Sequence, residues 1–105
     1  MKVAYLSCDF GVRLCGTSGA SVHVRETVTA LRRLGHDVLA VSPTEGADRV
    51  LPLDGLADEA LRFLEDERAG LPDHLSKEWR RLLYAEQVQR PLLALLAEFQ
   101  PDLIY

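Results

Sequence analysis

Three glycines lie between the first apolar run of the chain and the amphipathic stretch that follows it. Gly11, Gly16 and Gly19 stand after the apolar run at residues 3–8 and before Ala20. Glycine lets the backbone come close to a ligand, and the start of a helix offers N–H donors with a partial positive charge. A loop of this composition in this position is typical of a phosphate-binding site.

Two common phosphate motifs do not fit the loop. Gly11 and Gly16 have the spacing of a P-loop, but Thr17 stands where the P-loop has its lysine, so nothing would reach the β- and γ-phosphates. The dinucleotide fingerprint needs an acid at the end of the second strand, where this chain has Ser42. These departures argue against a nucleotide triphosphatase and a nicotinamide or flavin enzyme. A turn that merely needs Gly16 and Gly19 stays open as the structural alternative.

The candidate ligands for a substrate or its phosphate are polar side chains in and beside the loop: Asp9, Arg13, Ser18, His23 and, left open, Arg25. Asp9 could hold an acceptor hydroxyl or cap the loop, and Arg13 could grip phosphate or be an ordinary exposed arginine. His23 could donate to a sugar or phosphate, or be satisfied by the loop itself. Ser18 is also a candidate N-cap of the helix, with Thr17 as the alternative.

Strands and a helix around the loop position these residues. The continuous apolar run at residues 3–8 is typical of a parallel strand buried on both faces. Residues 20–34 carry apolar side chains at helical spacing, Gly35 can end that helix, and residues 37–42 form a second strand. Strand, loop, helix and strand make a βαβ unit. We predict the α/β class, with a Rossmann-like parallel sheet and flanking helices in a three-layer α/β/α arrangement.

The middle of the chain has weaker signals. A short third strand is predicted at residues 50–53, where Pro52 favours a sheet edge. A helix is predicted at residues 56–69, and a second helical pattern begins at Leu75. Pro91 is expected to break or kink this second helix, or to start a new one.

The chain has 105 residues, the size of one small domain. Residues 103–105 begin another strand, and the sequence stops within it. We therefore expect residues 1–105 to be a single partial domain, a fragment of a longer protein.

Composition narrows the function classes. Apolar residues make up 48% of the chain, enough for a core, and the net charge of −4 argues against a nucleic-acid partner. The spacing of Cys8 and Cys15 fits neither a redox pair nor a zinc site, so we expect two reduced thiols and no metal. The first apolar run is too short for a signal peptide. A cytoplasmic location is expected, with peripheral contact at the inner membrane face, through basic residues around Trp79, as the alternative.

Residues 16–26 (GTSGASVHVRE), followed by residues 31–38 (LRRLGHDV), resemble the opening of family 4 glycosyltransferases. Residues 2–6 and 101–105 are similar to further segments of that family. The resemblance covers residues 1–43 and 101–105. It is specific because the glycine loop, His-Val-Arg-Glu and Gly-His-Asp-Val occur in this order.

The resemblance implies a GT-B fold, in which two Rossmann-like domains face a cleft. This chain would be the N-terminal, acceptor-side half, and the donor-binding C-terminal domain with its paired glutamates would lie outside it. The implied reaction moves a sugar from a sugar nucleotide to an acceptor hydroxyl with retention. The sugar nucleotide is a co-substrate, and no cofactor or metal is implied.

The resemblance also places Gly16 and Gly19 near the donor diphosphate. Ser18 stands where many relatives have a basic residue, so a salt bridge from the loop would depend on Arg13. On this view a valine at Gly16 should block the ligand and leave the fold intact. The fragment alone is expected to be inactive, since it lacks the donor half. The alternative is a non-catalytic, Rossmann-like binding or interaction module, in which no second glycine-rich site and no paired glutamates would follow Tyr105.

Overall fold

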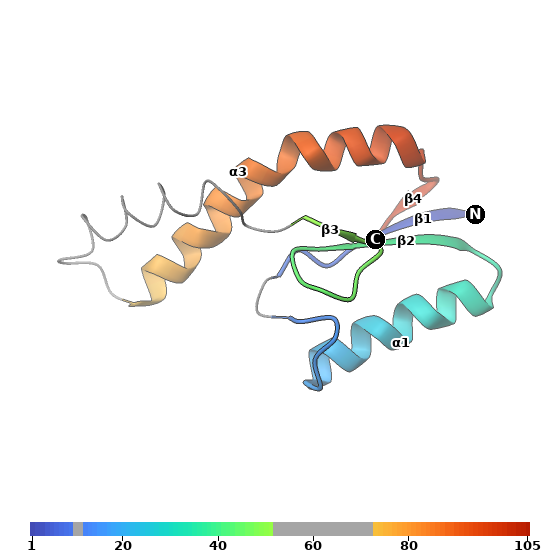
Figure 1. Ribbon diagram of the computed structural model, residues 1–105, viewed down its shortest axis with the longest axis horizontal. Coiled ribbons are helices and arrows are strands. Elements are labelled where there is room, and N and C mark those ends of the chain that lie inside the picture. Colours follow the sequence, from blue (N-terminus) through green and yellow to red (C-terminus); the bar gives the residue numbers. More distant parts are fainter. Residues whose placement is uncertain (10–11, 52–72) are drawn as a thin grey trace. The chain divides into compact units, whose positions relative to one another are not determined.

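The described strands form one parallel sheet (Figure 1). The computed structural model describes residues 1–9, 12–51 and 73–105. Within them, four strands pair in the order β3-β2-β1-β4 and all run parallel. The strands are β1 Lys2–Leu6, β2 Asp37–Ser42, β3 Arg49–Val50 and β4 Leu103–Ile104. The described helices are α1 Gly19–Arg33 and α3 Asp73–Phe99. The chain is therefore an α/β domain, as the sequence predicted.

The predicted elements agree closely with this arrangement in the first half of the chain. β2 has the predicted bounds, and α1 begins and ends one residue before the predicted helix. β1 ends at Leu6, although the amide of Ser7 still donates to the carbonyl of Val41 at 2.9 Å. The third strand is shorter than predicted, and the helix predicted at residues 56–69 lies outside the described residues.

Local signals set both ends of α1. The Ser18 hydroxyl accepts a hydrogen bond from the amide of Ser21 at 3.2 Å, so Ser18 is the N-cap. At the other end, Gly35 has a φ of +89°. The amide of His36 donates back to the carbonyl of Leu31 at 3.2 Å. This is a Schellman ending, which favours glycine because of the left-handed backbone.

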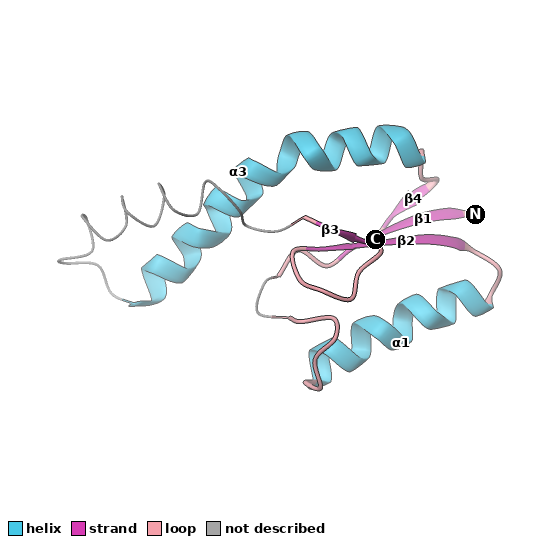
Figure 2. Cartoon of the chain, viewed as in Figure 1, coloured by secondary structure: helices cyan, strands magenta, loops and turns pink. Residues whose placement is uncertain are grey.

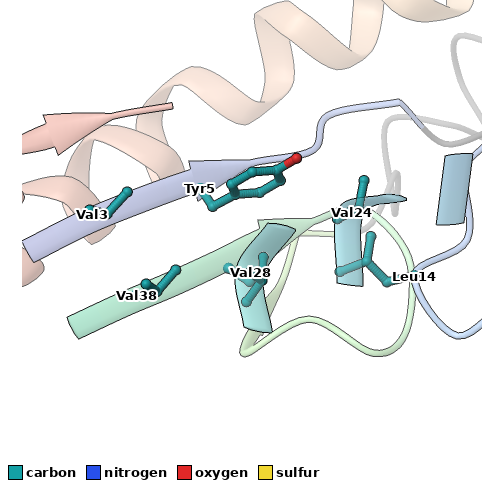
Figure 3. Close-up of a cluster of buried hydrophobic side chains, with 7 residues drawn as sticks. Val3, Tyr5, Leu14, Val24, Val28 and Val38 are labelled. Atoms are coloured by element: carbon teal, nitrogen blue, oxygen red, sulfur yellow. The ribbon is translucent and has the colours of Figure 1, made fainter. Parts of the chain in front are cut away.

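The core lies between the sheet and α1 (Figure 3). Alternate residues of β1 and β2 point toward the helix and meet apolar side chains of α1 and of the glycine loop. The cluster contains Val3, Tyr5, Leu14, Val24, Val28, Val38 and Ala40. Ala4, between two core residues of β1, is also buried. β1 is therefore buried on both faces, as its continuous apolar sequence predicted.

One edge of β2 is protected by side chains instead of a strand. Among the residues that the structure describes, β3 pairs with β2 at its end alone, at Val41 and Ser42. Nearer the start of β2, the amide of Ala40 donates to the Asp48 carboxylate at 2.7 Å, and the same carboxylate binds Arg32. Unpaired strand edges invite association with other chains, so this pairing closes an exposed edge.

The helix α3 continues through Pro91, so the expected break or new start there is wrong. Proline lacks the amide hydrogen of the helical ladder, at a cost of about 3 kcal/mol. Leucine and alanine, which are strong helix formers, occupy residues 92–97 and continue the helix after it. The proline nevertheless marks a division, because residues from Pro91 onward belong to the compact unit of the sheet and the preceding turns of α3 belong to another.

The core predicts a difference between two valines of α1. Val28 is 6% exposed and Val22 is 40% exposed. We expect Val28→Ala to lower the free energy of unfolding by about 2 kcal/mol more than Val22→Ala does, because only the first deletes buried methyl groups. Both changes alter helix propensity equally. The difference between their free energies of unfolding, measured in urea, therefore reports the burial of the side chain alone. Equal losses would contradict the placement of Val28 in the core.

Candidate functional site

The glycine loop lies at the carboxyl edge of the sheet, between β1 and α1. Because β1 and β2 are parallel, the segment after β2 leaves the sheet at the same edge. These two loops are drawn in pink in Figure 2, with residues 10–11 in grey. Open α/β sheets bind ligands outside the carboxyl ends of their strands. The loop therefore occupies the place that its sequence predicted.

Thr44, which follows β2, anchors the loop from the sheet side. Its hydroxyl accepts a hydrogen bond from the amide of Leu14 at 3.1 Å and donates to the carbonyl of Val12 at 3.2 Å. The hydroxyl of Ser42, which is fully buried, lies 3.0 Å from it. The sequence analysis missed Thr44. The sequence signal for Thr44 was its position two residues after the predicted strand at 37–42.

Arg25 anchors the loop from the helix side. One guanidinium nitrogen, Nη1, donates to the carbonyls of both Leu14 and Gly16. The arginine, which was left open between a ligand and a surface residue, thus binds the main chain of the loop. Hydrogen bonds from a charged group are the stronger kind, so this contact holds the loop firmly against α1.

A glycine in the second loop lets the two loops approach. Gly46 has a φ of +101°, which favours glycine. A Cβ atom there would lie 3.1 Å from the amide nitrogen of Cys15 and 3.2 Å from the Cβ of Leu14. Sequence reasoning missed this residue too, because its partners lie about thirty positions earlier in the chain.

The two glycines of the predicted site have different surroundings. A Cβ atom on Gly16 would lie 2.9 Å from the carbonyl oxygen of Arg13 and 3.0 Å from the Ser21 hydroxyl. The expectation that a valine at Gly16 would leave the fold intact is therefore wrong, since protein atoms already fill that space. A Cβ atom on Gly19 would meet nothing within 4 Å. At Gly19, therefore, there is open space beside the backbone, and the backbone conformation is one that other residues can adopt.

The start of α1 offers main-chain donors beside Gly19. The amide of Ser21 is capped by Ser18, and the amide of Val22 donates to the carbonyl of Ser18 at 3.0 Å. The preceding amides, of Gly19 and Ala20, have no acceptor within the helix because no turn comes before them. They belong to the region of partial positive charge at the helix N-terminus.

The remaining candidate side chains are exposed at or near this edge. Asp9, Arg13 and His23 are exposed. The main-chain carbonyl oxygen of each accepts a hydrogen bond from another residue. Those oxygens accept from the amide of Val12, the amide of Gly16 and the hydroxyl of Thr27, respectively. Ser18 is committed to capping through its hydroxyl, which also lies 2.8 Å from that of Ser21. Their roles as ligands stay predictions.

Nucleophilic or metal chemistry would depend on the two cysteines and on the possible metal ligands among the described residues. Cys8 and Cys15 are free cysteines at exposed positions, and partial desolvation of its thiol raises the pKa of Cys8 above its ordinary value. A protonated thiol is a poor nucleophile. Among the residues that the structure describes, no three His, Cys, Asp or Glu side chains gather as metal ligands. None of the described helices has both the length and the apolar character needed to cross a membrane.

The anchoring role of Thr44 can be tested with an isosteric change. We expect Thr44→Val to lower the free energy of unfolding by about 1–3 kcal/mol, because it leaves the Leu14 amide and the Val12 carbonyl without their partner. Thr29→Val, at an exposed position of α1, should change it by no more than about 0.5 kcal/mol. Urea unfolding of both variants checks this, and similar effects would show that Thr44 is no anchor.

Three comparisons with known proteins give no relative for this chain. No protein-family model, no curated protein and no solved structure matches it.

Proposed function

We propose that this chain is the acceptor-side, Rossmann-like domain of a retaining glycosyltransferase, which moves a sugar from a sugar nucleotide to an acceptor hydroxyl. The observation that carries the proposal is the glycine loop, anchored at the carboxyl edge between β1 and α1, in a sequence that resembles family 4 at residues 16–26 and 31–38. The proposal includes a three-layer α/β/α arrangement, a cytoplasmic location and a donor-binding domain outside this sequence.

The loop suits a diphosphate leaving group. When the bond between sugar and phosphate breaks, negative charge grows on the phosphate oxygens, and fixed N–H donors stabilise that charge. The amides of Gly19 and Ala20 are such donors, and Gly19 leaves room for close approach. Contacts to Thr44 and Arg25 already hold the loop in place. Little reorganisation would then be needed when the ligand binds.

Exposed side chains near the same edge supply the other roles in this proposal. Asp9, three residues after the end of β1, would accept a hydrogen bond from the acceptor hydroxyl. His23, in the second turn of α1, would donate to the sugar or phosphate, and Arg13 would pair with a phosphate oxygen. Ser18 would contribute as part of the loop backbone, because its hydroxyl already caps α1. Such groups act by positioning the reactants, while the paired glutamates of the other domain would complete the site.

Gly19→Val in the full-length protein tests the proposal. The added side chain enters open space, and Gly19 does not have the left-handed backbone found at Gly35 and Gly46. The free energy of unfolding should therefore change by no more than about 1 kcal/mol. We expect kcat/KM for release of nucleoside diphosphate from a sugar nucleotide to fall about tenfold or more, equal to about 1.4 kcal/mol of transition-state stabilisation.

The matched control is Ala30→Val, at an exposed position in the second half of α1. It adds similar bulk far along the helix from the loop and should leave kcat/KM unchanged. Full activity in Gly19→Val would return the loop to a purely structural turn. Failure of the full-length protein to bind or turn over any sugar nucleotide would favour the alternative, a non-catalytic binding module.

A further inference from the structure

Arg25 makes an unusual contact for an exposed arginine. A single nitrogen, Nη1, serves two main-chain carbonyls of the glycine loop, those of Leu14 and Gly16. Both bonds reach back from α1 to a segment nine to eleven residues earlier in the chain. The contact is therefore tertiary, and it acts on the peptide groups that lead into the helix.

The orientation of a carbonyl fixes the orientation of the next amide. In a trans peptide the C=O and the N–H point in opposite directions, and the described residues contain no cis peptide bond. Because Arg25 binds the Gly16 carbonyl, the amide hydrogen of Thr17 must point away from Arg25. Thr17 is exposed and directly precedes the N-cap of α1. Arg25 thereby fixes the direction of this amide, which comes two residues before Gly19 in the chain.

We propose that Arg25 is a positioning residue of the phosphate site: it acts through the loop, by orienting the Thr17 amide, and does not touch the phosphate itself. This inference rests on the proposed function. An arginine that clamps phosphate directly uses the two arms of its guanidinium fork, which is a role that lysine does not replace. Here the observed bonds use one nitrogen and end on the protein's own backbone.

Because Arg25 uses one nitrogen, an experiment can distinguish a positioning role from direct contact with phosphate. A lysine at this position carries three hydrogens on one nitrogen and can serve both carbonyls, although its chain is one bond shorter. A positioning role therefore predicts that Arg25→Lys keeps both the Thr17 signal and the affinity for the anion. A direct clamp predicts that Arg25→Lys loses the bidentate contact, and affinity with it, while the Thr17 signal is unchanged. Arg25→Met removes the donor under either role. Arg33→Met, at an exposed position in the last turn of α1, is the matched control.

Two readouts on the full-length protein test the inference: the NMR signal and exchange rate of the Thr17 amide, and the affinity for inorganic pyrophosphate. We expect Arg25→Met to shift the Thr17 signal, because the Gly16 carbonyl loses its donor. We also expect it to weaken pyrophosphate binding about tenfold or more, because a displaced amide no longer fits the ligand. Arg25→Lys should lie closer to the wild type than to Arg25→Met in both readouts. Arg33→Met should match the wild type.

Two results would overturn the positioning role. One is an Arg25→Met variant with an unchanged Thr17 signal. The other is an Arg25→Lys variant that keeps the wild-type Thr17 signal but binds pyrophosphate as weakly as Arg25→Met, which would mean direct contact with the anion. A wild-type protein that binds neither pyrophosphate nor a sugar nucleotide would contradict the proposed function instead. In that case the Thr17 signal alone still decides whether Arg25 orients the loop.

Discussion

The parallel pairing of β1 with β2 is the constraint on which the rest of the structure depends. The register runs from Lys2 opposite Asp37 to Leu6 opposite Val41, and hydrogen bonds from Asp37 to Met1 and from Ser7 to Val41 extend it at both ends. Because the strands run in the same direction, the chain must return through α1, and both strands end at one edge. A slip of one residue would turn the core side chains to the other face.

This edge is where contacts distant in sequence build the loop. The amide of Leu14 can reach the hydroxyl of Thr44, thirty residues later, only because β1 and β2 end side by side. Gly46 then lets the second loop pack against Cys15. Each neutral hydrogen bond contributes about 1 kcal/mol and each charged one about 1.5–3 kcal/mol. The loop is thus held by several modest contacts, and a ligand would find its donors already arranged.

Features that depend on neighbours in sequence could be predicted. Features that depend on contacts between segments distant in sequence could not. The cap at Ser18, the stop at Gly35 and the bounds of β2 follow from rules that act over a few residues. Pro91 was misjudged because the helix formers after it continue the helix.

The candidate site shows the same limit. The glycine loop was placed at the correct edge of the sheet, since a βαβ unit makes its two strands parallel and both then end at the same edge. The surroundings of individual residues were not foreseen. Gly16 packs against Arg13 and Ser21, whereas Gly19 faces open space, and a spacing of glycines carries no such information. Thr44 was missed because a hydroxyl residue after a strand gains its role only from the loop that folds onto it.

Three cations of this acidic chain share one structural role. Arg25 binds the carbonyls of Leu14 and Gly16, Arg32 binds the carbonyl of Val38 at 3.1 Å, and Lys2 binds that of Phe99 at 2.8 Å. These carbonyls lie in the glycine loop, at the free edge of β2 and at the end of α3, where the regular ladders leave acceptors without a partner.

This use of cations bears on how the chain would hold an anion. A cation bonded to main-chain carbonyls stabilises the backbone, and part of its capacity to donate is already used. In a chain with a net charge of −4, the proposed site would then rely on oriented amides at the start of α1. Amide donors are fixed by the fold and carry no net charge. Such a site would bind a diphosphate by shape and direction more than by opposite charge, so its strength would depend on how firmly the loop is held.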